Sequence, residues 1–359
     1  MPGGGCACRN KIAERAVPEV WVAASFAPSP LSIPTGHTID SPLTKASDRS
    51  RPAEARRLHV VVNCGAGTVE RLGADAVRQT LETAFAEAGM SAELSFIDGK
   101  ADVGHAAKQA AEQAARGEID AVVVGGGDGT VRTVAALLAG TRTPLGVLPL
   151  GTLNHFARDL GMPLDLAAAV RAIAGFQAEA VDIAEVNGTV FINNSSIGIY
   201  PHMVAERKRR HLPGRVGKWV AMTLASLRAL RLFPRRRLVV HAEGAALPCR
   251  TPCLLVGNNA YEMDFLSLGT RKHLDGGKLH LYVARSATPP AFLWLGLRAV
   301  LGLVRPGRDL DTITATSAEV TSRASRLLVA FDGEVETMAT PLCYRIRPRG
   351  LQVLVPVEA

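Results

Sequence analysis

The glycine-rich stretch at residues 125–130, Gly-Gly-Gly-Asp-Gly-Thr, constrains this chain more than any other segment. It follows the apolar run 121–124 and precedes a helix-like run at 131–138. A strand that ends in glycines and opens into a helix brings backbone N–H groups close to a ligand, and helix N-termini attract phosphate. Asp128 would repel that phosphate unless a divalent cation lay between them. The stretch therefore predicts a polyphosphate site that uses a metal, and it indicates phosphoryl transfer.

Strand-like and helix-like runs alternate on both sides of this loop. Strands are expected at 58–62, 91–97, 120–124 and 145–148, and helices at 73–88, 102–116, 131–138 and 154–160. This alternation predicts a doubly wound, parallel α/β domain. After about residue 182 short strand-like runs take over, interrupted by two helices at 217–232 and 290–303. The second part of the chain is therefore expected to be a mainly antiparallel β domain.

Charge is concentrated in one segment. The chain has a formal net charge of +8, and residues 203–237 contain eleven Lys or Arg but a single acidic residue. Such a patch favours an anionic membrane surface as partner, although a solvated basic face over a core helix is the alternative. Aromatic residues make up only 5% of the chain, which disfavours a nucleic-acid partner that is bound by base stacking. No apolar run is long enough to predict a membrane-spanning helix.

Three small polar loops follow three of the predicted parallel strands, at 63–68, 125–130 and 149–154. Ligands of such sheets bind where the strands end, so the three loops are expected to hold a nucleotide between them. The dinucleotide fingerprint does not fit, because its third glycine is missing in both glycine loops. A P-loop does not fit either, because no Lys-Ser or Lys-Thr pair follows the glycines.

Three motifs in this order resemble the diacylglycerol kinase catalytic family, which includes bacterial lipid kinases and sphingosine kinases. They are the loop at 125–130, the segment Pro-Leu-Gly-Thr-Leu-Asn-His-Phe-Ala-Arg-Asp-Leu-Gly at 149–161, and Asp-Gly-Glu at 332–334. The first two are highly specific and the third is weak alone. The resemblance spans about residues 58 to 356. It implies an ATP- and Mg²⁺-dependent kinase that phosphorylates a hydroxyl of a diacylglycerol-like or sphingoid lipid.

The resemblance also implies which residues form the site. It makes Asp128 and Glu334 the catalytic residues, with Asp128 beside the catalytic magnesium and Glu334 as the base. Some family members hold a structural magnesium in the second domain, and that site would use the Asp275 side chain with the carbonyls of Lys272 and Gly277. The nucleotide site maps onto Asn63, Gly125, Gly126, Gly127, Asp128, Gly129, Thr130, Gly151 and Thr152.

Plainer interpretations of two of these motifs stay open. Asp-Gly-Glu at 332–334 follows a strand-like run and suits an ordinary hairpin turn, and Asp-Gly-Gly at 275–277 also suits a turn. The sequence departs from the family at three places: Arg132 and Thr133 stand where many relatives have Asn-Glu, His155 stands where many have Asp, and Cys64 stands where the first loop usually has Pro. An enzyme similar to NAD kinase, which shares the first loop, is the second hypothesis, but the segment 149–161 argues against it. The departures motivate a third hypothesis, a catalytically inactive nucleotide- or lipid-binding module.

The expected organisation follows from these assignments. Residues 1–56 lack periodicity and are interpreted as a disordered or mis-assigned extension. Residues 57–182 form the nucleotide-binding domain, completed by 343–357, and residues 183–342 form the lipid-substrate domain. The helix at 290–303 is expected either to line an acyl-chain pocket or to pack in the core. The expected location is the cytoplasm, with peripheral association at the inner membrane face, and a homodimer is left open.

Overall fold

The computed structural model describes residues 56–175, 177–209, 235–261, 271–285, 288–305 and 307–356. All of them belong to one compact unit, Pro52–Ala359. Residues 1–55 of the predicted extension, the predicted helix at 217–232 and most of the basic segment 203–237 lie outside the described residues.

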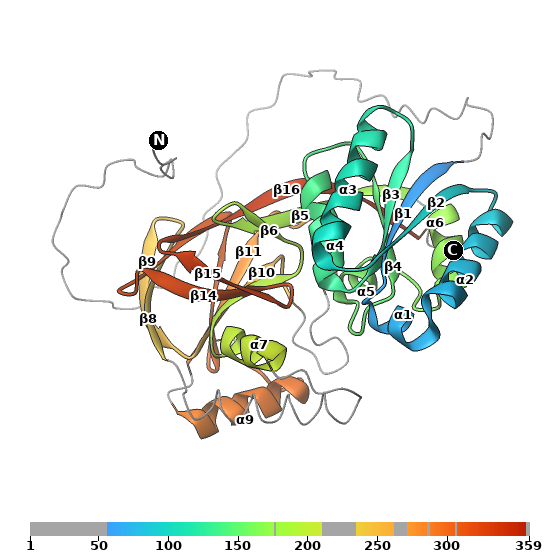
Figure 1. Cartoon of the computed structure of the whole chain (residues 1–359). Coiled ribbons are helices and arrows are strands. Elements are labelled where there is room, and N and C mark those ends of the chain that lie inside the picture. Colours follow the sequence, from blue (N-terminus) through green and yellow to red (C-terminus); the bar gives the residue numbers. More distant parts are fainter. Residues whose placement is uncertain are drawn as a thin grey trace, which may run out of the picture. The chain divides into compact units, whose positions relative to one another are not determined.

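Four parallel strands form the first part of the larger sheet, in the order β2-β1-β3-β4 (Figure 1). Their bounds are β1 Arg57–Asn63, β2 Ser91–Ile97, β3 Ala121–Gly126 and β4 Leu145–Pro149. Strands β3 and β4 are buried along their whole length, as expected for parallel strands that are covered by helices on both faces. Figure 1 shows α3 and α4 on one side of these strands and α2 and α6 on the other. The predicted doubly wound α/β fold is confirmed.

The helices of this part bury one face each. In α4, Asp128–Leu138, the buried residues Val131, Val134, Ala135 and Leu138 recur every three or four positions, which is the period of an amphipathic helix. Sequence analysis did not predict α1 and α6. The bounds of the helices are α1 Gly67–Leu72, α2 Ala74–Glu87, α3 Lys100–Ala115, α5 His155–Asp159 and α6 Leu166–Ala174.

Strand β16, Leu342–Val355, joins the parallel strands to the rest of the larger sheet. It runs parallel to β4 at one end, where Val353 is paired with Leu145, and antiparallel to β13 at the other. It also pairs along most of its length with β5, Gln177–Val186, so the last of the described strands lies in the middle of the first sheet. The remaining strands of this sheet are β6 Thr189–Phe191, β8 Arg236–Ala242, β9 Ala245–Thr251 and β13 Ser317–Ser322.

A second sheet, entirely antiparallel among the described strands, follows the order β12-β11-β10-β7-β14-β15. The mainly antiparallel second part was predicted and is confirmed. A second hydrophobic core, centred on residues such as Phe191, Leu281 and Tyr344, lies between this sheet and the antiparallel part of the first. The strands are β7 Asn194–Gly198, β10 Cys253–Asn258, β11 Leu279–Ala284, β12 Leu310–Ala315, β14 Arg326–Phe331 and β15 Glu334–Ala339.

Among the described residues, two further helices accompany the second sheet, α7 at Ile199–Arg209 and α9 at Pro289–Val300. Helix α9 agrees with the prediction at 290–303, but it is not core: Leu293, Trp294 and Leu297 are 55%, 60% and 47% exposed. None of the helices in the described part of the chain has the length and apolar character needed to cross a bilayer.

Candidate functional site

A cavity of about 280 Å³ lies where the three polar loops meet at the carboxyl edge of the parallel strands. Parallel strands all end at this edge, so loops that are far apart in sequence come together there. Thr133, noted above as a departure from the family pattern, and Gly67 of the first polar loop also contribute to the wall, as does Val103 of α3, which sequence analysis did not single out. Seven of the predicted residues line the cavity: Asn63, Gly127, Gly129, Thr130, Gly151, Thr152 and Glu334.

The glycine-rich loop places the start of α4 at this cavity. Strand β3 ends at Gly126, and α4 begins at Asp128 with Gly127 as its N-cap, so no side chain caps the first turn. An uncapped first turn leaves backbone N–H groups that can bind an anion. Asn63, at the end of β1, donates a hydrogen bond through Nδ2 to Thr130 Oγ1 at 2.9 Å and thereby fixes this turn against the first loop.

Glycine allows close packing within this loop and between this loop and the second loop. Gly125 and Gly126 are packing positions, because a Cβ at either would come within 2.7 Å of Leu150 or Thr130 side-chain atoms. Gly151 of the second loop lets the two loops approach each other, since a Cβ on Gly151 would lie only 2.4 Å from the Cα of Gly127. The close approach therefore requires glycine at position 151, whereas a Cβ on Gly127 would meet the Cα of Gly151 at an ordinary 3.7 Å.

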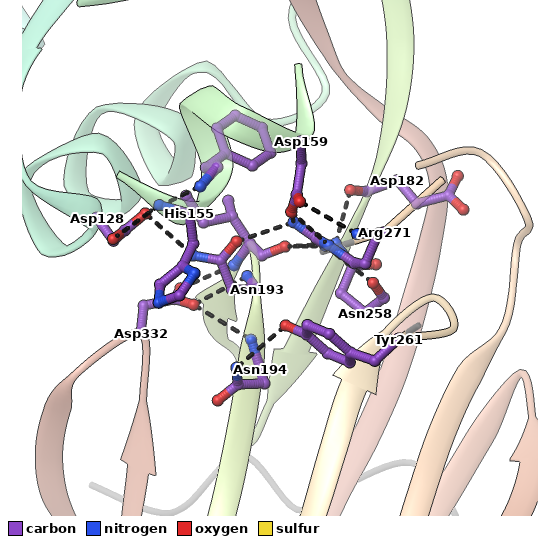
Figure 2. Close-up of polar contacts among 12 residues, drawn as sticks. Asp128, His155, Asp159, Asp182, Asn193, Asn194, Asn258, Tyr261, Arg271 and Asp332 are labelled. Atoms are coloured by element: carbon purple, nitrogen blue, oxygen red, sulfur yellow. Dashed lines mark hydrogen bonds and ion pairs between the residues drawn. The ribbon is translucent and has the colours of Figure 1, made fainter. Parts of the chain in front are cut away.

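Asp128 does not line the cavity; its carboxylate turns toward the second loop (Figure 2). It accepts hydrogen bonds from the backbone N–H of His155 at 3.3 Å and of Phe156 at 3.0 Å, at the start of α5. The side chain of Asn193, which comes from the second half of the chain, donates to Asp128 Oδ1 at 3.4 Å. Asp128 therefore ties the first glycine loop to the segment 149–161, and three of the roughly four lone-pair sites of its carboxylate are used, so about one stays available to a cation.

Asn193 is held in one orientation by a buried arginine. Arg271 donates through Nη2 to Asn193 Oδ1 at 2.8 Å, so the amide group of Asn193 must turn its Nδ2 toward Asp128 (Figure 2). Arginine can only donate hydrogen bonds, which makes this orientation the one that satisfies both ends of the amide. Sequence analysis missed both residues, because nothing in their local sequence marks them.

Arg271 in turn forms a buried ion pair with Asp159 of the segment 149–161. Its Nη2 lies 2.6 Å from Asp159 Oδ2, and the two side chains are 0% and 1% exposed. Arg271 Nη1 donates to the carbonyls of Ile192 and Asn258, so the guanidinium has a full set of acceptors. Burial raises the pKa of Asp159, while the neighbouring Arg271 acts in the opposite direction. A chain of contacts thus links Asp159, Arg271, Asn193 and Asp128.

The motif Asp-Gly-Glu at 332–334 forms a hairpin turn, as the alternative interpretation predicted. The same turn places Glu334 at the cavity. Asp332 and Gly333 both have positive φ angles, 47° and 77°, and connect β14 to β15. The Asp332 carboxylate accepts hydrogen bonds from the backbone N–H groups of residues 192, 193 and 194. Burial raises the pKa of Asp332 to about 6, although these N–H donors and Arg132 favour its ionised form.

Glu334 is paired with Arg132, one of the residues at which this chain departs from the family pattern. Arg132 Nη2 donates to Glu334 Oε2 at 2.9 Å, and the side chains are only 12% and 18% exposed. The same guanidinium lies over the Phe331 ring, 5.0 Å from its centroid. Helix α4, which starts at the glycine loop, therefore also holds the predicted base in place. No sequence signal connects residues 132 and 334, which are 202 positions apart.

The predicted second-domain metal site looks different from its expected form. Asp275 is exposed, and the carboxylate built into this region is that of Asp182, which is buried and accepts from Gly277 N at 2.6 Å and Arg349 N at 2.8 Å. The Asn259 side chain donates to the same carboxylate. Among the described residues no group of three or more His, Cys, Asp or Glu side chains is arranged so that it could hold a metal ion. The ligand set of Asp275, Lys272 and Gly277 stays a prediction.

Comparison with known proteins identifies relatives over most of the chain. Residues 57–186 match the model of the diacylglycerol kinase catalytic domain. An uncharacterized protein of Synechocystis sp. is 27% identical over 317 residues, which are 84% of this chain and 70% of that protein. A diacylglycerol kinase of Bacillus subtilis is 28% identical over 224 residues, 61% of this chain and 71% of that protein.

The fold is shared with a solved structure. The crystal structure of a diacylglycerol kinase from Bacillus anthracis str. Sterne superimposes with a TM-score of 0.62 at 20% identity, covering 84% of this chain and 97% of that chain. At this identity the likeness concerns the fold alone.

Proposed function

The chain belongs to the diacylglycerol kinase catalytic domain family, a family of lipid kinases, and on that premise we propose that it transfers the γ-phosphoryl group of ATP, with Mg²⁺, to a hydroxyl of a diacylglycerol-like or sphingoid lipid. The main support for this proposal is that one cavity is lined by the uncapped start of α4, by the loop around Gly151 and Thr152, and by Glu334. The proposed place of action is the inner face of the cytoplasmic membrane.

The cavity wall suits a chain of phosphates. The first turn of α4 offers backbone N–H groups without a side-chain cap, and the macrodipole of α4 adds positive potential at the same point. Gly127 and Gly151 leave main chain exposed where side chains would otherwise stand. Thr130 and Thr152 line the same cavity, and their hydroxyls add donors of the kind that phosphate oxygens accept.

Asp128, which lies next to the cavity without lining it, would hold a magnesium ion that accompanies the nucleotide. Mg²⁺ is usually held by one or two carboxylates together with water and phosphate oxygens, so a single carboxylate beside the cavity is enough. Asn193 and the N–H groups of His155 and Phe156 orient that carboxylate without exhausting its acceptor capacity. Bound in this way, the ion would neutralise charge on the phosphates.

Glu334 is proposed to orient the attacking lipid hydroxyl. Phosphoryl transfer needs little covalent chemistry from the protein, so placing the hydroxyl in line and balancing charge are the main contributions. Glu334 lines the cavity and is held by Arg132, and Arg132 also brings a positive charge next to the site of transfer.

The test is an assay of the purified full chain with radiolabelled ATP, Mg²⁺ and a panel of lipids, followed by extraction and mass identification of the product. We expect label in the organic phase, and a loss of at least about 100-fold in rate for Glu334→Gln. Asp128→Asn should raise the Mg²⁺ concentration needed for half-maximal rate. Label in the aqueous phase with NAD as acceptor, or ATP binding without any turnover, would contradict the proposal.

A further inference from the structure

Helix α9 is apolar on its outer face as well as its inner face. It starts at Thr288, whose Oγ1 accepts from the N–H of Ala291, and runs through Pro289–Val300. Phe292 and Leu295 are partly buried on one side. A helix with apolar side chains on every face is normally buried on every face. The exposed outer face of α9 therefore indicates a surface that binds a partner.

Four large apolar residues form this outer face: Leu293, Trp294, Leu297 and Leu301. They are 55%, 60%, 47% and 45% exposed, and Leu303 follows at 55%. Positions 293, 297 and 301 recur every four residues and 294 adjoins 293, so the four side chains fall within an arc of about 100°. Leu293, Trp294, Leu297, Leu301 and Leu303 are called the α9 face below. In Figure 1 α9 lies outside the second sheet.

Arg298 braces the turn that follows α9. It donates through Nη2 to the carbonyl of Leu303 at 2.6 Å and through Nη1 to Asp309 Oδ1 at 2.8 Å. These bonds hold the turn that carries Leu301 and Leu303, which reduces the ordering cost of covering these two residues.

Charge around the α9 face is positive. Residues 288–308 contain three arginines and no acidic residue. Arg305 and Arg308 are exposed just beyond Leu303. The nearest carboxylates in the following segment are already used, since Asp309 pairs with Arg298 and Asp311 with Arg285. Leucine and tryptophan beside exposed arginines are the composition of helices that lie in the interface of an anionic bilayer.

We propose that the α9 face docks the protein onto the surface of an anionic lipid bilayer, with Leu293, Trp294 and Leu297 inserted at the boundary of headgroups and acyl chains. Arg305 and Arg308 would contact lipid phosphates. A second copy of the chain is a poorer occupant, because a symmetric contact would bring the arginines of both copies together. This inference rests on the proposed function, in which the substrate is a lipid of the membrane. Binding of the protein to the bilayer nevertheless requires neither ATP nor catalysis.

The test measures binding of the full chain, without ATP, to vesicles of phosphatidylcholine with or without phosphatidylglycerol. We expect the double variant Leu293→Ser with Leu297→Ser to lose at least about tenfold in affinity for the anionic vesicles. The matched control is Leu72→Ser with Leu164→Ser, because these leucines are 53% and 52% exposed elsewhere on the protein. The control should bind like the parent chain.

Two further variants separate the contributions. Arg305→Gln with Arg308→Gln should cost roughly fivefold per arginine on anionic vesicles and little on neutral ones. The blue shift of tryptophan emission on vesicle binding should be reduced in Trp294→Phe. Unchanged binding of the serine double variant would overturn the proposal, and so would dimerisation through the α9 face, seen by sedimentation, without vesicle binding. Vesicle binding by a chain that phosphorylates no lipid would contradict the proposed function and leave the docking intact.

Discussion

Arg132 and Glu334 form a nearly buried ion pair, with 2.9 Å between Nη2 and Oε2, although one lies on the helix of the glycine-rich loop and the other on a strand of the second sheet. The pair connects the two elements that the proposed reaction needs together. A charge-assisted bond of this kind fixes the direction of the carboxylate as well as its charge.

Replacing Arg132 by methionine is expected to lower the rate of lipid phosphorylation by about 10- to 100-fold, because a displaced catalytic group costs about that much. The affinity for ATP should change less, since Arg132 does not line the cavity. Steady-state kinetics at saturating Mg²⁺ measure both quantities. Arg132→Lys keeps the charge and should recover part of the rate; equal rates in Arg132→Met and the parent chain would show that the pair does not position Glu334.

Replacing Arg271 by methionine is expected to destabilise the fold by about 3–5 kcal/mol, because Asp159 would remain buried without its partner. Denaturant unfolding measures the change. The double variant Arg271→Met with Asp159→Leu removes both charges and should be more stable than Arg271→Met alone. If the double variant is the less stable of the two, the unpaired charge is not the cause.

Replacing Gly151 by alanine is expected to disrupt the nucleotide site, because the new Cβ would lie 2.4 Å from the Cα of Gly127 and neither backbone can yield without moving a loop. ATP affinity, measured by calorimetry, should fall at least about tenfold. Gly104→Ala is the matched control, since its Cβ would meet the Thr133 side chain at an ordinary 3.9 Å inside a helix. If Gly151→Ala bound ATP as tightly as the parent chain, the loops at 125–130 and 149–154 would not form the nucleotide site in the way proposed.

Asp332 should give the protein a specific dependence of stability on pH. Its pKa is about 6 in the folded protein and about 3.9 in an unfolded chain, so the folded state binds the proton more tightly. The stabilising contribution is therefore complete below about pH 4 and is lost as pH rises to about 6. Unfolding free energies of the parent chain and of Asp332→Asn, measured from pH 4 to 7, should differ by an amount that falls by up to about 3 kcal/mol. A difference that stays constant with pH would contradict the raised pKa.

Most of the α/β part of the fold could be predicted from the sequence alone. The valines of β3 and the period of α4 are local patterns that report burial directly, and the three glycine or polar loops follow from the rule that parallel strands end at one edge. Helix α1 was not predicted because its six residues carry too little periodicity. Helix α6 was overlooked although its sequence has an N-cap at Asp165, a C-cap at Gly175 and an apolar face formed by Ala169, Val170 and Ile173. Strand β16 could be expected as a strand, but its pairing partners β4, β5 and β13 depend on packing across the whole chain.

The candidate site likewise contains residues that could be predicted from the sequence and residues that could not. Asp128, Gly151 and Glu334 stand in motifs whose spacing is readable, whereas Asn193 and Arg271 became visible only through their contacts. The direction of the Asp128 carboxylate, toward α5 and not into the cavity, was likewise decided by tertiary structure. Local sequence determines which backbone conformations and burial patterns are favourable. Which donor meets which buried acceptor depends on segments hundreds of residues apart, and only the folded chain brings Arg132 to Glu334 and Arg271 to Asp159.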